Sequence, residues 1–199
     1  MDTLTDTGTI AQMRRQLAEA RRVQEAVQEL VPALAALAEH IADAYRNQRQ
    51  VIFFGNGGSA AAAQHWAAEL SGRLYMDRST LPALALTTNT SQLTAIANDY
   101  GYDEVFARPL SGLARPGDVA VGISTSGRSV NVLRGLEAAR QRGALTVGFT
   151  GASGDAMAPL CDYLIRIPSD DVARIQEGHE LCGHLIWAAV EELLFGEQT

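Results

Sequence analysis

Residues 53–73, FFGNGGSAAAAQHWAAELSGR, decide the fold, because they pass from an apolar strand through a glycine-rich turn into a helix. Glycines ahead of a helix are typical of a site where backbone N–H groups meet an anion. The helix carries His65 and Glu69, which are four residues apart and so lie on one helical face. Such a pair can share a metal ion or move a proton, and a plain surface ion pair has the same spacing.

The rest of the chain repeats the order of strand and then helix. Apolar runs followed by turn residues predict strands at residues 51–55, 81–87, 118–124, 145–151 and 163–168, and helical patterns lie at residues 60–74, 91–100, 130–142 and 173–195. Strands that alternate with helices predict a parallel sheet in an α/β sandwich. The first and third strands each lead into a loop of small residues, so both loops should face one crevice at the carboxyl ends of the strands.

An amphipathic helical pattern precedes the first strand, over residues 9–48. Apolar residues recur there every three or four positions, at Leu17, Ala20, Val23, Val27, Leu30, Leu34, Leu37 and Ile41. Pro32 should kink or split this region into two helices. We predict a single domain over residues 1–199, with residues 1–50 as N-terminal helices and residues 51–199 as an α/β core ending in a helix. The N-terminal helices could cover their own sheet or pack against a partner subunit.

Composition narrows the classes of function. The net charge of −7 argues against binding to nucleic acid or to an anionic membrane, because both need a basic surface. Two cysteines, Cys161 and Cys182, form no disulfide framework and indicate a reducing compartment. No apolar run reaches the length of a membrane span, and the first residues lack a signal pattern. A cytoplasmic enzyme or binding protein is the expectation.

The loop after the third predicted strand is rich in hydroxyl groups. Four of its six residues carry one, namely Ser124, Thr125, Ser126 and Ser129, and a helix begins directly afterwards. Unpaired N–H groups and the helix dipole make such a place favourable for phosphate. Ordinary N-capping would need only Ser129. The surplus of hydroxyls therefore favours a phosphate site.

The loop after the first strand has a competing interpretation. Residues 55–60, GNGGSA, formally fit the dinucleotide fingerprint G-x-G-x-x-G/A. That fingerprint also needs an acidic residue at the end of the next strand, where this chain has Thr87, Thr88, Asn89 and Thr90. A nicotinamide or flavin enzyme is therefore disfavoured, and close approach of a sugar to the loop's N–H groups remains favoured.

A second run of polar residues begins the last predicted helix, at residues 174–184, RIQEGHELCGH. Gln176 and His184 are eight residues apart, about two turns on one face. Gly178 and Gly183 should let another backbone or a ligand come close, and His179 lies on a different face. Two histidines, one glutamate and one glutamine from two helices could form a zinc site, if the two helices meet.

Asn98 and Asp99 end the predicted helix at residues 91–100. Residues of these types commonly form turns. Their oxygens can also accept hydrogen bonds from sugar hydroxyls. Both interpretations stay open on the sequence alone.

Taken together, these motifs resemble the phosphoheptose isomerases, the sedoheptulose 7-phosphate isomerase branch of the sugar isomerase (SIS) fold. The resemblance rests on GNGGSAAAAQH, AAELSGR, LTAIANDYGY, GISTSGRSVNV, GFTG and RIQEGHELCGH, in this order, and extends from about Gln50 to the end. It implies a flavodoxin-like three-layer α/β sandwich, and a homotetramer with active sites at subunit interfaces. It also implies conversion of sedoheptulose 7-phosphate to D-glycero-D-manno-heptose 7-phosphate.

The resemblance also assigns residues. It implies one zinc ion per subunit held by His65, Glu69, Gln176 and His184, with Glu69 and His184 as the catalytic pair. The positions matching substrate contacts are Asn56, Gly57, Gly58, Asn98, Asp99, Ser124, Thr125, Ser126, Ser129 and Gln176, and we add Ser59 from the same turn as Gly58. Ketose–aldose isomerisation through an enediol needs a base beside carbon, which Glu69 can supply, and an acid or relay, which His184 can supply.

Two other functions are possible on this fold. A replication-initiation protein that binds DnaA resembles this family without being an isomerase, and its branch lacks the Glu and the last His. A sugar-phosphate sensor would need the phosphate loop without that pair. Three residues have open roles: Arg128 stands where many relatives carry Asn, Ala173 where some carry an acid, and Arg73 could reach a phosphate or a neighbouring subunit.

Overall fold

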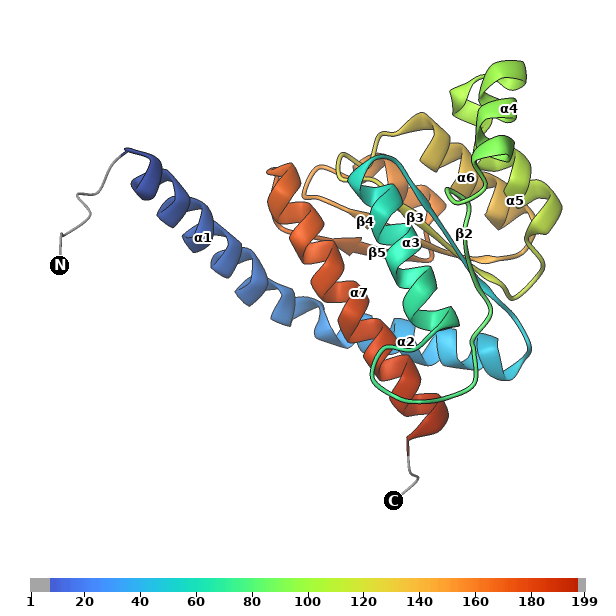
Figure 1. The fold of residues 1–199 in the computed structure, drawn as a ribbon, viewed down its shortest axis with the longest axis horizontal. Coiled ribbons are helices and arrows are strands. Elements are labelled where there is room, and N and C mark those ends of the chain that lie inside the picture. The colour runs from blue at the N-terminus through green and yellow to red at the C-terminus, as the bar shows by residue number, and fades with distance from the viewer. Residues whose placement is uncertain (1–7, 197–199) are drawn as a thin grey trace.

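The protein is described by a computed structural model over residues 8–196, and its centre is a five-stranded parallel sheet (Figure 1). The strands are β1 (Val51–Gly55), β2 (Ala83–Ala85), β3 (Val119–Ile123), β4 (Leu145–Thr150) and β5 (Tyr163–Arg166). They lie in the order β2-β1-β3-β4-β5, which is the flavodoxin-like order. The predicted parallel sheet is thus confirmed. The end residues 1–7 and 197–199 of the predicted domain lie outside the described residues.

Helices cover both faces of the sheet, so the fold has three layers. The helices are α1 (Gly8–Ala26), α2 (Val31–Arg46), α3 (Gly58–Ser71), α4 (Thr90–Tyr100), α5 (Ala107–Leu113), α6 (Val130–Gln141) and α7 (Val172–Phe195). Along β1, Val51 and Phe53 join the core with α2, α3 and α7, whereas Ile52 and Phe54 join the core with α5 and α6. Because side chains alternate along a strand, burial on both faces explains why β1 is apolar throughout.

The N-terminal helical region is divided as predicted. A short 3₁₀ helix, Val27–Leu30, separates α1 from α2, and Pro32 lies in the first turn of α2, where its missing N–H is tolerated. Helix α2 packs against α7, with Leu37 and Ile41 fully buried. Helix α1 extends away from the sandwich (Figure 1), and its Met13 and Leu17 are exposed. Helix α2 therefore covers its own sheet, and α1 leaves apolar side chains uncovered within this subunit.

Helix α5 and the end of α3 differ from the prediction, and β2 is shorter than the strand predicted over residues 81–87. Helix α5 was not predicted, because its seven residues include Pro109 and Gly112, which are poor helix formers. It forms because Leu110 is buried in the core that α5 shares with α6. Helix α3 ends at Ser71 instead of residue 74, because Arg78 donates hydrogen bonds to the carbonyls of Leu70 and Gly72. Within residues 8–196, no helix has both the length and the apolar character required to cross a membrane.

Candidate active site

The loops after β1 and β3 meet at the carboxyl edge of the sheet. The two strands are neighbours, and the chain reverses its direction of strand addition between them. A side chain on Gly55, the last residue of β1, would come within 2.9 Å of the carbonyl oxygen of Ile123, the last residue of β3. Ligands of open parallel sheets bind at such a reversal point. Both predicted loops therefore face one crevice.

The first loop brings the start of α3 against α7. Gly57 occupies the N-cap position with φ of +55°, a conformation that favours glycine. A Cβ atom on Gly58 would lie 2.2 Å from the Gln176 side-chain nitrogen, so only glycine leaves room for that amide. Gly58, Ser59, Gln176 and Glu180 line a cavity of about 310 Å³ between the two helices. This cavity offers polar groups from both elements.

Asn56 is held by two residues that the sequence analysis did not single out. Its amide exchanges hydrogen bonds of 2.9 Å in both directions with the amide of Asn131, which is buried in the first turn of α6. The Tyr102 hydroxyl donates to the Asn56 oxygen at 3.1 Å. Asn131 could have been suspected as a polar residue directly behind the hydroxyl loop. The network fixes which way the Asn56 amide points.

The hydroxyl loop uses its serines differently from an ordinary helix cap. Ser129 occupies the N-cap position of α6, but its side chain caps none of the described N–H groups. The Ser129 hydroxyl lies 2.9 Å from the Ser124 hydroxyl, and Ser126 accepts a hydrogen bond from the Arg128 N–H. Ordinary N-capping by Ser129 is therefore wrong as an explanation of the loop. The hydroxyl of half-buried Thr125 belongs to the same loop.

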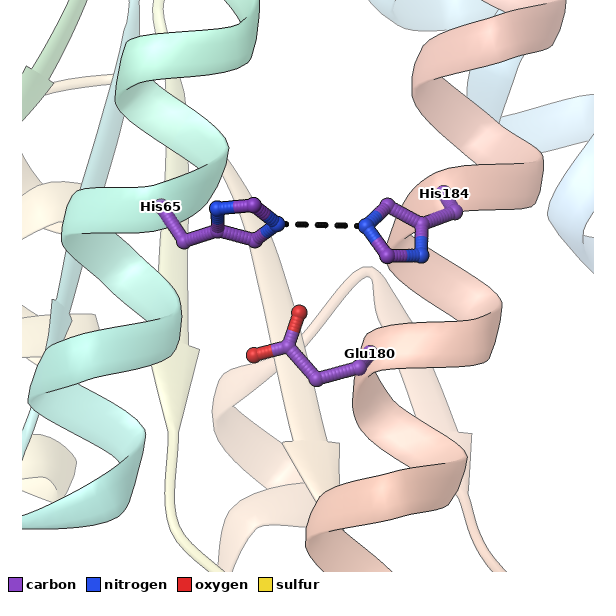
Figure 2. Close-up of side chains that lie close together, drawn as sticks. All are labelled: His65, Glu180 and His184. Carbon is purple, nitrogen blue, oxygen red and sulfur yellow. Dashed lines mark hydrogen bonds between the residues drawn. The ribbon is translucent and has the colours of Figure 1, made fainter. Parts of the chain in front are cut away.

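Helices α3 and α7 bring His65, Glu69 and His184 together. The His65 Nε2 and His184 Nε2 atoms are 3.2 Å apart, and both lie close to Glu69 Oε1, at 3.4 Å and 3.3 Å. Figure 2 shows the two imidazole rings pointing at one another from the two helices. Two facing Nε2 atoms share at most one proton, so a cation between them is a natural complement.

This triangle fits a small divalent metal ion. Zinc lies about 2.0–2.1 Å from nitrogen and oxygen ligands in a tetrahedron, which separates neighbouring ligand atoms by roughly 3.3 Å. The three distances among the His65 Nε2, His184 Nε2 and Glu69 Oε1 atoms, 3.2–3.4 Å, agree with that separation. The other oxygen of Glu69, Oε2, is buried and has no hydrogen-bond partner among the described residues. The donor set of two imidazoles and a carboxylate suits such an ion.

The surroundings of Glu69 favour its action as a general base. Burial raises the pKa of Glu69 above its ordinary value, and a nearby carboxylate, Glu180, adds to the increase. The charges of His65 and His184 act in the opposite direction. A carboxylate with a raised pKa binds a proton more readily, as general-base catalysis requires.

Glu180 is a further member of this cluster. Ligand atoms of His65, Glu180 and His184 all lie within 4.8 Å of one another, and Glu180 reaches in from α7 in Figure 2. The indole N–H of buried Trp66 donates to Glu180 Oε2 at 3.0 Å. The sequence feature that could have indicated Glu180 as a site residue is its position one helical turn before His184. Gln176 lies one turn earlier still, beside Gly58, so the structure gathers three of the four expected ligands and places Gln176 next to them along α7.

Asn98 and Asp99 lie at the exposed end of α4. The Asn98 side chain donates to Asp99 at 2.8 Å, and both residues are exposed. The chain then continues to Tyr102, which contacts Asn56. The structure therefore connects them to the site through Tyr102, without bringing them to the histidines.

Gly178 and Gly183 of α7 allow close packing, but the groups that approach them are side chains of this chain. A Cβ atom on Gly183 would lie 2.6 Å from the Trp66 indole, and one on Gly178 would lie 2.8 Å from Ile167. The expectation of a backbone or ligand at these positions is thus wrong. His179 faces the core, where its Nε2 lies 3.1 Å from the Thr150 carbonyl oxygen, consistent with its assignment outside the ligand set.

Comparison with known proteins agrees with this architecture. The family model described as SIS domain matches residues 16–151. A phosphoheptose isomerase of Geotalea daltonii is 48% identical over 190 residues, which are 95% of this chain and 99% of that protein. The solved phosphoheptose isomerase of Neisseria gonorrhoeae superposes with a TM-score of 0.85 at 40% identity, covering 92% of this chain and 98% of that one. The solved enzyme of Francisella tularensis gives a TM-score of 0.90 at 30% identity, over 94% and 100% of the two chains.

Proposed function

We propose a specific reaction for this chain, which belongs to the phosphoheptose isomerases, a family of SIS-domain enzymes that isomerise sugar phosphates. The proposed reaction converts sedoheptulose 7-phosphate to D-glycero-D-manno-heptose 7-phosphate. The observation that carries this proposal is the contact between Glu69 and His184 beside the loops that follow β1 and β3. A base, an imidazole and a polar crevice are the parts that a ketose–aldose isomerase needs.

The reaction moves one proton between neighbouring carbons. The Glu69 carboxylate removes a proton from C1 of the ketose, and the C1–H electron pair forms the double bond of an enediol. The same proton, or one exchanged with solvent, is then returned to C2, which leaves an aldehyde at C1. His184 carries a proton between the oxygens on C1 and C2, since an imidazole can give and accept protons near neutral pH.

The hydroxyl loop is proposed to bind the phosphate. Ser124, Thr125, Ser126 and Ser129 present hydroxyls beside the N-terminus of α6, and Ser129 is not used as a cap. Holding the far end of the substrate positions its C1–C2 end. Asn56, Gly57, Gly58, Ser59 and Gln176 are proposed to contact the sugar, with Asn98 and Asp99 at the edge of the site.

One zinc ion per subunit is part of the proposal. His65, Glu69 and His184 would hold it, and the family resemblance assigns Gln176 as a fourth ligand. The distances among the side chains of His65, Glu69 and His184 support these three residues as ligands. When bound, the ion stabilises negative charge on the substrate oxygens.

A homotetramer in a cytoplasmic, reducing setting completes the proposal. The side chains of His65 and His184 are 50% and 41% exposed in this subunit, which supports a neighbouring subunit covering the site. Exposed Met13 and Leu17 on α1 offer apolar surface for such contacts. Both cysteines are free, as a reducing compartment allows.

A direct assay tests the function. Zinc-supplemented protein is incubated with sedoheptulose 7-phosphate, and the aldose product is followed by NMR, with Glu69→Gln as the control. Product from the wild type alone supports the isomerase. Absence of product from a folded wild-type protein that still binds the sugar phosphate contradicts catalysis and favours a sensor or a DnaA-binding protein.

A further inference from the structure

We propose that Arg78 and Glu191 are positioning residues of the active site, which together hold the end of α3 that carries Glu69 against α7, which carries His184. The inference rests on the proposed function, because it assumes the roles given there to Glu69 and His184. The side chains of Arg78 and Glu191 form an ion pair and are only 2% and 1% exposed. Any influence on the reaction therefore passes through the groups that they hold.

Arg78 fixes the last turn of α3. Its Nη2 donates a hydrogen bond to the Glu69 carbonyl oxygen at 3.0 Å, and its Nη1 donates to the carbonyl oxygens of Leu70 and Gly72 at 2.7 and 3.2 Å. The last carbonyls of a helix have no partner within the helix, and their partial negative charge attracts a cation. Because α3 ends at Ser71, the backbone of Glu69 lies in this turn. The guanidinium thus holds the backbone from which the proposed base projects.

Glu191 holds both Arg78 and the chain that follows α3. Its carboxylate accepts a hydrogen bond from Arg78 Nε at 3.0 Å and lies 2.9 Å from Arg78 Nη2. It also accepts hydrogen bonds of 2.9–3.1 Å from three successive backbone N–H groups, those of Leu74, Tyr75 and Met76. A carboxylate removed from water needs such a full set of donors. Arg78 is therefore fixed by a residue of α7.

Glu69 is thereby attached to α7 through both its side chain and its backbone. Its Oε1 atom lies 3.3 Å from His184 Nε2, and its carbonyl oxygen is held by Arg78, which is paired with Glu191. His184 and Glu191 are seven residues apart, about two turns along one face of α7. The two helices lie side by side in Figure 1. The ion pair thus sets the position of the proposed base relative to His184, where an error of about 1 Å can cost roughly 100-fold in rate.

A simpler role for the ion pair would be to stabilise the fold. In that case its loss would lower the free energy of unfolding, while the protein that stays folded would turn over at the wild-type rate. A positioning role predicts a different result, because a displaced base slows the chemical step and leaves substrate binding largely intact. The quantity that separates the two roles is therefore kcat, measured on folded protein and compared with KM.

The test uses two mild substitutions, Arg78→Lys and Glu191→Gln. Lysine keeps the positive charge, but its single ammonium group cannot bond Glu191 and all three carbonyls at once. Glutamine keeps one oxygen as an acceptor and removes the negative charge. We expect kcat to fall about ten- to 100-fold and KM to change less than about threefold for each variant. The double variant should be little slower than the slower single variant, because both substitutions act through one ion pair.

The substitution Leu110→Ala is the matched control for a loss of stability. Leu110 is fully buried in the core that faces α5 and α6, on the opposite side of the sheet from α3 and α7. Its truncation leaves a cavity that lowers the free energy of unfolding without touching either helix of the site. We expect its kcat to stay within about twofold of the wild type. Urea denaturation measures the stability of every variant, and circular dichroism checks that each is folded in the assay.

Two kinetic results overturn the inference. A wild-type kcat in folded but less stable Arg78→Lys and Glu191→Gln proteins limits the ion pair to stabilising the fold. An equal fall of kcat in Leu110→Ala attributes the loss of activity to stability alone. Each of the two substitutions decides by itself, so the test stands if one of them prevents folding.

Crystal structures of the wild type and Arg78→Lys test the positioning without an activity assay. The distance between the Cα atoms of Glu69 and His184 should change by more than about 0.5 Å, the tolerance of a catalytic arrangement, and a smaller change refutes the inference. A wild type that shows no turnover, with a distance that changes on substitution, sinks only the proposed function. Turnover by the wild type with an unchanged distance in the variant sinks this inference alone.

Discussion

Asn56 and Asn131 exchange two amide hydrogen bonds of 2.9 Å each, which ties the loop after β1 to the first turn of α6. The hydroxyl loop and the proposed sugar-binding loop are thus held at a fixed spacing. A site that recognises both ends of one substrate requires such a spacing.

Replacing Asn131 by Ala should weaken both stability and binding. The substitution leaves the Asn56 side-chain N–H without its Asn131 acceptor and the Asn56 oxygen with Tyr102 alone, which costs on the order of 1–3 kcal/mol of unfolding free energy. We also expect a higher KM with a smaller change in kcat. Urea denaturation and steady-state kinetics check this. The control, Tyr102→Phe, removes one exposed hydroxyl contact and should cost less; equal losses in both variants contradict the bridging role of Asn131.

Replacing Ser124 or Ser129 by Ala should mainly weaken substrate binding. A hydrogen bond to a charged group contributes about 1.5–3 kcal/mol, which corresponds to roughly 10- to 100-fold in KM. Because Ser129 caps none of the described N–H groups, its loss should cost only its hydrogen bond with the Ser124 hydroxyl, about 0.5–1.5 kcal/mol of unfolding free energy. Steady-state kinetics and thermal melting measure both effects. A marked fall in melting temperature without a change in KM for Ser129→Ala would restore the capping role.

Replacing Glu69 by Gln should remove turnover. The amide cannot accept the carbon proton, and loss of a positioned base typically costs 10²- to 10⁴-fold, as a rough guide. Solvent-exchange NMR at C1 of the ketose isolates the proton-removal step. The variant should keep the oligomeric state of the wild type in light scattering. Wild-type exchange at C1 in Glu69→Gln would place the base elsewhere.

His179 should make the protein less stable in mild acid. Burial lowers the pKa of His179 from its ordinary value of 6.5 to about 4, although the bond to the Thr150 carbonyl opposes this. Between these values the unfolded chain binds the proton and the folded chain does not. Stability therefore falls as the pH drops from 6.5 to about 4, by up to roughly 3 kcal/mol.

Chemical denaturation at several pH values measures this slope. His179→Gln should flatten it, because the amide does not titrate in this range. A His179→Gln protein with the wild-type slope would assign the acid sensitivity to other groups.

The sequence predicted the sheet well because β1 and β3 are buried on both faces and are therefore apolar at every position. It failed at α5, where packing of Leu110 outweighs the poor helix propensity of Pro109 and Gly112. His65 and Glu69 could be paired from spacing alone, since they share a helix. Glu180 could not be placed, because its approach to His65 depends on how α3 packs against α7 and on the space that Gly183 leaves for Trp66.

The contact between Trp66 and Glu180 also gives the protein an internal optical probe. Trp66 and Trp187 are the only tryptophans of the chain, and their ring centres are 5.7 Å apart in the core. The Trp66 indole is hydrogen-bonded to a side chain that faces the two histidines. Any ion entering between the imidazoles changes the electric field along that N–H bond. The intrinsic fluorescence of the unlabelled enzyme should then follow loading of the centre in real time.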